Sequence, residues 1–124
     1  MFRSAAALCA TLALALPANA FMARNSLVVE PRADGTFEVP YRGLSGASDF
    51  WCAAGDYVFR ELGLPPETRI FRVSGPPRRS GQGITFSLSP EGATKTGLFI
   101  LGDNRSVSAA HARQLCEVKT LIAD

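Results

Sequence analysis

The segment DFWCAAGDYVFRELG, residues 49–63, constrains the fold most, because its spacing, start signal and stop signal all predict the same element. Its main apolar stripe at helical spacing consists of Trp51, Gly55, Val58 and Leu62. Ser48 or Asp49 is the expected N-cap, and the Gly-Leu-Pro-Pro sequence that follows the last turn ends a helix. We therefore predict an amphipathic helix that buries this stripe.

Helical geometry separates the polar side chains of this segment from the stripe. Asp49, Asp56 and Arg60 fall on the opposite side, where we expect solvent, so we do not interpret the two aspartates as a catalytic carboxylate pair. Asp56 precedes Arg60 by four residues, the favourable order for an ion pair. Gly55 is out of place, since a glycine inside a helix costs about 1 kcal/mol relative to alanine. Its position beside Trp51 predicts that another backbone element crosses closely there.

The first twenty residues have the three parts of a secretory signal peptide. Arg3 supplies the positive charge, residues 5–16 form an apolar run, and Ala18 and Ala20 occupy the small positions before a cleavage point. A membrane anchor is the alternative, but it needs about 18–20 apolar residues, and this run is shorter. We expect export with cleavage after Ala20, which also removes Cys9 and leaves no membrane span.

Cleavage leaves residues 21–124, with twelve basic and eleven acidic side chains. A chain of this length is expected to form one domain with one core. Its near-neutral charge gives no reason to expect nucleic acid as a partner, because nucleic acid would require a basic face.

Cys52 and Cys116 are the two cysteines that remain, in a compartment that permits oxidation. We predict a disulfide between them, which in the chain-entropy model stabilises the fold by roughly 4 kcal/mol. A zinc site is the alternative, but neither thiol has a neighbouring Cys or His at ligand spacing. We therefore expect no metal and no other cofactor.

Alternation of apolar and polar residues predicts a mainly antiparallel sheet of four or five strands. The candidate strands cover residues 27–30, 36–41, 68–74, 84–89 and 94–101. Pro40 is expected to place the second of these at an edge of the sheet. Residues 94–101 are apolar on both faces, which is typical of a central strand.

A second helix is expected over residues 108–118, with Ser108 as its N-cap. Its inner face carries Ala109, Ala112, Leu115 and Cys116, and the small side chains permit close approach to the first helix. The fold we predict is a two-layer α+β domain in the order ββαβββα. Its two helices pack together or side by side on one face of the sheet, tied by the disulfide. A small sandwich with peripheral helices is the alternative.

Arg78 and Arg79 are the only adjacent arginines, and they lie in residues 75–83, GPPRRSGQG, where turn-forming residues predict a long hairpin loop. This pair is the best candidate for contact with an anion or an acidic partner surface. A merely solvated loop is the alternative. The glycines do not form a phosphate-binding loop, because no helix and no lysine follow at the required spacing.

Phe50 and Tyr57 lie off the main apolar stripe, so they are a candidate exposed patch for a partner, whereas Trp51 is assigned to the core. His111 is the single histidine of the chain. The sequence places neither a nucleophile nor an orienting carboxylate beside it, so we interpret it as a surface residue and assign no catalytic residue.

The run FWCAAGDY, with a later helix that ends in ARQLC, resembles small exported bacterial proteins of unknown function. The resemblance spans most of residues 21–124. It implies a paired cysteine and a cell-envelope setting, and it implies no activity.

We therefore expect a small periplasmic or secreted domain that acts as an interaction or accessory module for a protein partner in the cell envelope. A small-ligand-binding protein or an enzyme, with a site between sheet and helices, is the alternative. An inhibitor of a secreted hydrolase is a third reading, which rests on small size, one disulfide and a long loop.

Overall fold

The computed structural model describes residues 20–44, 46–99 and 104–123, and every statement below refers to these residues. The predicted signal peptide, apart from Ala20, lies outside them. None of the helices in these three ranges has the length and apolar character needed to cross a membrane.

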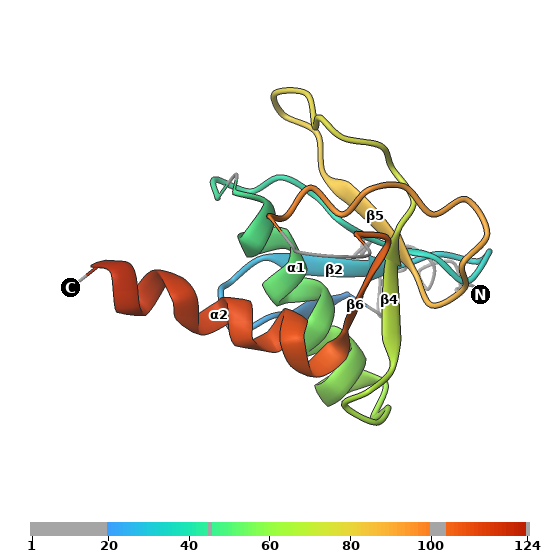
Figure 1. The fold of residues 1–124 in the computed structure, drawn as a ribbon, viewed down its shortest axis with the longest axis horizontal. Helices are drawn as coiled ribbons and strands as arrows, with labels where there is room; N and C mark the ends of the chain where they lie inside the picture. The colour runs from blue at the N-terminus through green and yellow to red at the C-terminus, as the bar shows by residue number, and fades with distance from the viewer. Residues whose placement is uncertain (1–19, 45, 100–103, 124) are drawn as a thin grey trace, which may run out of the picture.

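Six short strands form one antiparallel sheet, so the α+β prediction is confirmed and the number of strands exceeds the four or five expected. The strands are β1 (Phe21–Met22), β2 (Val28–Pro31), β3 (Phe37–Val39), β4 (Arg69–Arg72), β5 (Ile84–Ser87) and β6 (Ser106–Ser108). Their order across the sheet is β1-β2-β3-β5-β4-β6. The sheet twists strongly, since β2 and β4 run at a steep angle to each other (Figure 1).

Pro40 predicted that the strand containing Phe37 and Val39 lies at an edge of the sheet, and this prediction is wrong. β3 lies between β2 and β5, with Glu38 opposite Thr85. The strand ends at Val39, so Pro40 follows it directly and its missing N–H removes no bond from the ladder.

The expected central strand at residues 94–101 is wrong for its described part, residues 94–99, which contain no strand; residues 100 and 101 lie outside the description. Gly97 has a φ of +81°, which breaks the extended conformation. The carbonyl of Thr96 accepts hydrogen bonds from two side chains, Trp51 Nε1 at 2.9 Å and Arg72 Nη1 at 3.2 Å. The place beside β4 belongs instead to β6, with Ile70 opposite Val107.

The first helix begins two residues before the predicted start. α1 (Ala47–Asp56) continues directly into a wider turn, η2 (Tyr57–Glu61), in which the N–H of Leu62 bonds to the carbonyl of Tyr57. The side chain of Asp49 accepts a hydrogen bond from the N–H of Gly46, at 3.1 Å, and so closes the first turn. The wide turn shifts the phase of the residues after it, and Leu62, predicted to be buried, is 39% exposed.

The second helix, α2 (Ala109–Ala123), begins directly after β6. The Ser108 hydroxyl accepts a hydrogen bond from the N–H of His111, at 3.1 Å, which confirms the predicted cap. The element order is therefore βββαβββα, and β1 and β6 are the strands that the sequence did not predict.

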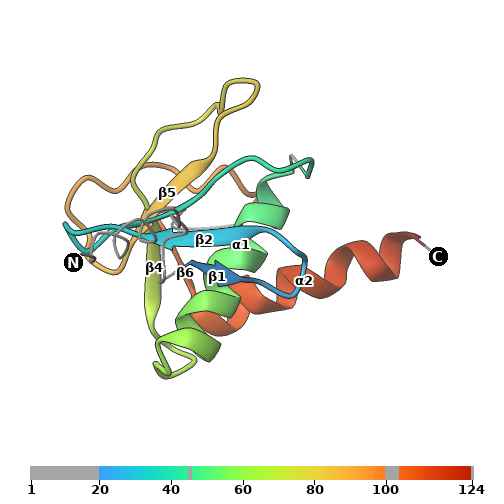
Figure 2. The ribbon, with the colours of Figure 1, turned by 180° about the vertical axis from the view of Figure 1, so that it is seen from behind.

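α1 lies between the sheet and α2, as both views show (Figures 1 and 2). Toward the sheet, Trp51 packs edge-on against Phe86 with ring centroids 4.7 Å apart, and Tyr57 packs against Phe37 at 4.8 Å. On the other side α2 covers the helix. All residues from Asp49 to Val58 are consequently buried, so no side of the helix is exposed to solvent over these residues.

The predicted close crossing at Gly55 is confirmed, and the element that crosses there is α2. A Cβ atom on Gly55 would lie 2.7 Å from the Cβ atom of Ala112 and 2.8 Å from the backbone nitrogen of Arg113. The disulfide between Cys52 and Cys116, also predicted, joins the same two helices, with the Cα atoms 4.8 Å apart.

We predict that Gly55→Ala destabilises the protein by about 1–3 kcal/mol, because the added methyl overlaps α2 and well-packed cores tolerate extra atoms poorly. The sign of the change in the free energy of unfolding is informative, since the same substitution in an uncrowded helix would stabilise that helix by about 1 kcal/mol. Urea unfolding measures the difference.

Gly75→Ala is the matched control, because a Cβ atom there meets only the methyl group of Thr94, at 3.9 Å. We expect its free energy of unfolding to stay within about 0.5 kcal/mol of the wild type. A Gly55→Ala protein as stable as the wild type would contradict the close crossing.

Candidate functional site: an arginine-braced loop and the hollow beneath it

Residues 75–83, which we call the arginine loop, connect the neighbouring antiparallel strands β4 and β5, as the sequence predicted. The loop projects from the body of the domain (Figures 1 and 2). Internal hydrogen bonds hold its shape: the N–H of Gln82 donates to the carbonyl of Arg79 at 3.0 Å, and the N–H of Arg79 donates to Gln82 Oε1 at 3.2 Å.

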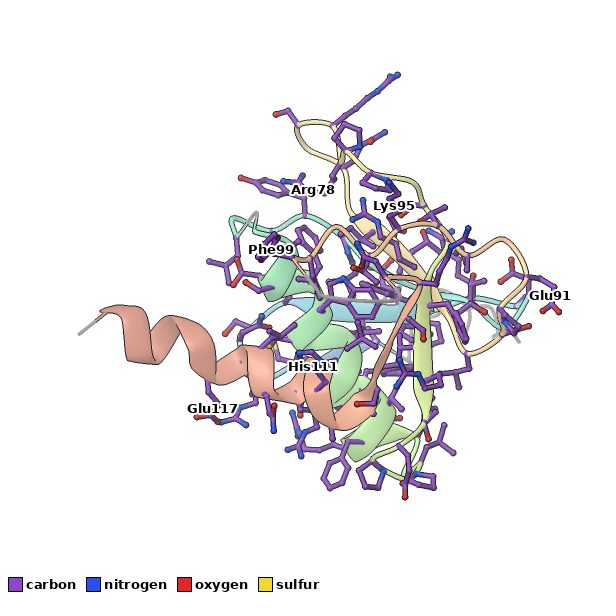
Figure 3. The ribbon with its side chains drawn as sticks, in the orientation of Figure 1. Arg78, Glu91, Lys95, Phe99, His111 and Glu117 are labelled. Atoms are coloured by element: carbon purple, nitrogen blue, oxygen red, sulfur yellow. A yellow bond between two sulfur atoms is a disulfide. The ribbon has the colours of Figure 1, made fainter. Side chains whose placement is uncertain are left out.

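The two arginines of the loop have different roles. Arg78 lies under the tip of the loop (Figure 3) and donates from Nη1 to the carbonyl of Gln82 at 2.8 Å. Its guanidinium group lies over the ring of Phe50, at 5.0 Å, and over that of Tyr41, at 5.5 Å. Arg79 is exposed. Arg78 therefore braces the loop against the body, and Arg79 is presented to solvent.

Beneath the loop is a surface hollow of about 300 Å³, which we call the arginine hollow. It is lined by Ala47, Arg72, Pro76, Pro77, Arg78, Ile84 and Gly97. Arg72 is only 2% exposed, and donates to the carbonyls of Ser74, from Nε at 2.6 Å, and Thr96, from Nη1 at 3.2 Å. Burial, and then the positive charge of Arg78, lower the pKa of Arg72 below its usual value.

Two exposed aromatic side chains belong to the same region. Tyr41 is 41% exposed and contacts Arg78, and Phe99 is fully exposed. Phe99 follows Gly97, which lines the arginine hollow, by two residues. The loop, the hollow and Tyr41 thus share one part of the surface, and Phe99 lies two residues along the chain from the hollow.

The predicted exposed patch at Phe50 and Tyr57 is wrong. Phe50 is completely buried and Tyr57 is 5% exposed, because α1 is covered on all sides. Phe50 instead supports Arg78, and Tyr57 packs against Phe37 and Phe21. Burial, and then the charge of Glu61, raise the pKa of the Tyr57 hydroxyl.

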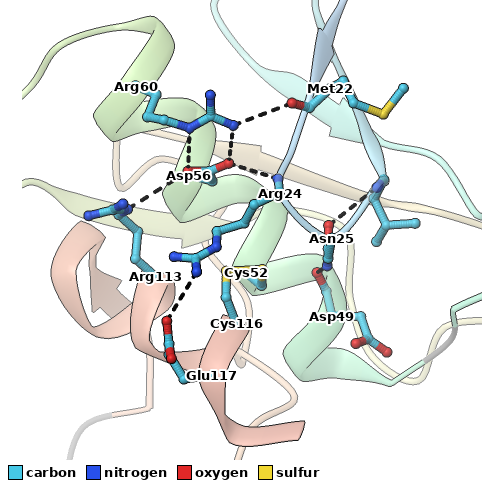
Figure 4. Close-up of a disulfide and its surroundings, with 11 residues drawn as sticks. Met22, Arg24, Asn25, Asp49, Cys52, Asp56, Arg60, Arg113, Cys116 and Glu117 are labelled. Atoms are coloured by element: carbon cyan, nitrogen blue, oxygen red, sulfur yellow. Dashed lines mark hydrogen bonds and ion pairs between the residues drawn. A yellow bond between two sulfur atoms is a disulfide. The ribbon is translucent and has the colours of Figure 1, made fainter. Parts of the chain in front are cut away.

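The aspartates of α1 are also buried, contrary to the prediction. Asp56 has no exposed surface and accepts hydrogen bonds from Arg60, at 2.9 Å and 2.6 Å, and from the backbone N–H of Arg24, at 2.9 Å (Figure 4). The predicted pair with Arg60 is therefore confirmed, in a buried setting. Arg113 of α2 adds an ion pair at 3.8 Å.

Asp56 is a clamp that joins the chain before β2 to α1 and α2, beside the disulfide (Figure 4). Burial alone would raise the pKa of its carboxyl group. The hydrogen bonds from Arg60 and Arg24 and the charges of Arg60 and Arg113 outweigh burial and hold the pKa below its usual value.

The described part of the chain holds few other side chains that could act in catalysis or metal binding. His111 is exposed on the outer side of α2 (Figure 3). Within residues 20–44, 46–99 and 104–123, no group of three His, Cys, Asp or Glu side chains could hold a metal ion.

Sequence reasoning missed two residues of this region. Arg72 alternates with Ile70 in a strand, but Phe71 and Val73 suggested the opposite face as the inner one, so its burial was not evident. Phe99 was hidden in an apolar run that predicted a covered strand.

No family model matches the chain, and the searches find no similar curated protein or solved structure. The resemblance to small exported bacterial proteins stays a prediction.

We predict that Asp56→Asn lowers the free energy of unfolding at neutral pH by about 1.5–3 kcal/mol, because it removes the charge of a buried carboxylate that accepts hydrogen bonds from Arg60 and from the Arg24 N–H. The pKa of Asp56 is lowered by folding, so its contribution is present above pH of about 4 and is lost as the pH falls through the folded pKa. The variant should therefore lose less stability than the wild type on acidification. Urea titrations at several pH values measure both effects.

Glu67→Gln, at an exposed position, is the control for loss of one negative charge and should match the wild type at both ends of the pH range. An Asp56→Asn protein with the pH dependence of the wild type would contradict the clamp.

Proposed function

We propose that this chain is a small exported, disulfide-bonded interaction module that docks on a protein partner in the cell envelope. The contact face comprises the arginine loop with Tyr41 and Phe99. The observation that carries the proposal is that Arg78 braces the projecting arginine loop and lies over the ring of the exposed Tyr41, while the fully exposed Phe99 comes two residues after Gly97 of the arginine hollow.

The composition of this face suits protein recognition. Aromatic side chains and arginine dominate the residues that contribute most to binding at protein interfaces. A fully exposed phenylalanine gains nothing from solvent, whereas a partner surface would bury it. A loop already held by its own hydrogen bonds loses little conformational entropy on docking.

Charge narrows the class of partner. Arg79 is exposed on the loop, and Lys95 is exposed in the segment before Gly97. An acidic surface on the partner would complement them and would speed association at low salt. We therefore propose a partner with an acidic patch rather than a nucleic acid, since the charge of the chain as a whole is nearly balanced.

Export is supported by two observations. The disulfide is of the kind that persists in oxidising compartments. β1 begins at Phe21, directly after the proposed cleavage point, and its Phe21 pairs with Val29. Cleavage after Ala20 would therefore leave every strand and helix of the domain complete.

The alternative of a ligand site between sheet and helices has less support. Trp51, Phe86, Phe37 and Tyr57 are buried at that interface and pack ring against ring. The arginine hollow opens at the surface, outside this layer.

Expression in a Gram-negative host should yield, in the envelope fraction, a protein that lacks residues 1–20 and two hydrogens. Intact-mass measurement without reductant shows both changes at once. Arg3→Glu combined with Ala18→Arg should leave the full-length chain inside the cell, because it removes the charge and one small residue of the signal. A mature mass that retains residues 1–20 would contradict the cleavage.

Arg79→Glu and Phe99→Ser should each weaken capture of the envelope partner by crosslinking, by about tenfold or more, as expected for interface residues of these types. Quantitative mass spectrometry of the crosslinked partner measures the loss. Neither change should alter thermal unfolding, because both side chains are exposed.

Arg69→Glu makes the same charge change at the opposite end of β4 from the loop, and should leave capture intact. If Arg79→Glu and Arg69→Glu affect capture equally, the loop is not the contact. Unchanged capture by both the Arg79 and the Phe99 variants would likewise reject the contact face.

A further inference from the structure

Arg72 is a buried cation whose charge no anion of the described residues balances. It is 2% exposed, and the ion pairs found in the described ranges do not include it. Two carbonyl groups accept from Nε and Nη1, and Nη2 has no acceptor among the same residues. Removing a guanidinium group from water costs several kcal/mol unless charge and hydrogen bonds compensate.

Other arginines of the fold form ion pairs with carboxylates. Arg60 and Arg113 share the carboxylate of Asp56, Arg24 pairs with Glu117 at 3.2 Å, and Arg32 pairs with Glu38. These arginines are more exposed than Arg72, yet each has a carboxylate. The most deeply buried guanidinium group is thus the one that lacks an anion within the chain as described.

The arginine hollow places further positive potential in front of Arg72. Arg78 lines the same hollow, and its charge is close enough to lower the pKa of Arg72. Ala47, the first residue of α1, also lines it, so the hollow lies at the positive end of that helix. Among the described residues, the others that line it are Pro76, Pro77, Ile84 and Gly97, none of which is acidic.

We propose that the arginine hollow binds a single oxyanion group, a carboxylate or a phosphate, between the guanidinium groups of Arg72 and Arg78. The group belongs either to a small solute or to an acidic side chain of a partner. A free anion and a partner's carboxylate would meet the same guanidinium group of Arg72, so binding requires no protein partner.

The chemistry of the hollow fits this ligand class. Nη2 of Arg72, the nitrogen without an acceptor among the described residues, would donate to an oxygen atom of a carboxylate or phosphate, and such charge-assisted hydrogen bonds are stronger than neutral ones. Apolar walls from Pro76, Pro77 and Ile84 reduce competition from water and so strengthen the attraction. A volume of about 300 Å³ admits such a group with part of the molecule that carries it.

The test is titration of the oxidised protein, purified from the envelope fraction, with sodium acetate and with inorganic phosphate at constant ionic strength. Nitrogen-detected NMR of the arginine Nε groups follows binding at the residue concerned. We expect saturable shifts of the Arg72 and Arg78 signals in the wild type, and the arginine that remains in each variant reports its binding. Arg72→Met should weaken binding by about tenfold or more, since it removes charge-assisted hydrogen bonds.

Arg79→Gln is the matched control, because it removes the neighbouring exposed charge and leaves the hollow intact. It should bind the anions as the wild type does. Binding that falls equally in Arg79→Gln and Arg72→Met would show general attraction to a basic loop and would overturn the proposal. So would the absence of saturable binding in the wild type, or full binding by Arg72→Met.

Arg72→Met should fold, because methionine has a similar length and brings no charge into the core. If thermal unfolding shows that it does not, Arg78→Met takes its place, and wild-type affinity in that variant overturns the proposal. A glutamate-containing peptide and its glutamine counterpart identify the source of the group. Tighter binding of the glutamate peptide than of acetate indicates a partner side chain, and binding of phosphate or acetate alone indicates a free solute.

Discussion

The contact between α1 and α2 at Gly55 determines much of what surrounds it. Because Gly55 has no side chain, the backbone of α2 comes close enough for Cys116 to reach Cys52. The same approach covers the side of α1 that faces away from the sheet. Any polar group on that side must then be satisfied inside the protein, and the clamp around Asp56 does this.

Features that depend on neighbours in the sequence could be predicted. Short-range spacing predicted four features: the helix at residues 49–63, the cap at Ser108, the loop at residues 75–83 and the pair Asp56–Arg60. Gly55 indicated a close crossing because glycine is unfavourable inside a helix. The disulfide followed from counting cysteines. The burial of Asp56 and Phe50 could not be predicted, because it depends on distant parts of the chain: Arg24 and Arg113 contact Asp56, and Arg78 lies over Phe50.

The candidate site was predicted in part, for a related reason. Turn-forming residues identified the arginine loop, but nothing local separates a bracing Arg78 from a presented Arg79, since the rings under Arg78 come from Tyr41 and Phe50. Arg72 looked like an ordinary polar position of a strand. Its importance arises only when the segment around Thr96 folds over it and the loop closes above the hollow.

The disulfide has a consequence for how the arginine loop would withstand proteolysis. Cys52 and Cys116 are 64 residues apart, and the backbone between them closes into a covalent ring that contains β4, β5 and β6. Residues 75–83, which project from the body of the domain (Figure 1), lie inside this ring. A protease that cuts the loop opens the ring but releases neither half. The exposed loop can therefore be nicked while the domain stays one covalent molecule.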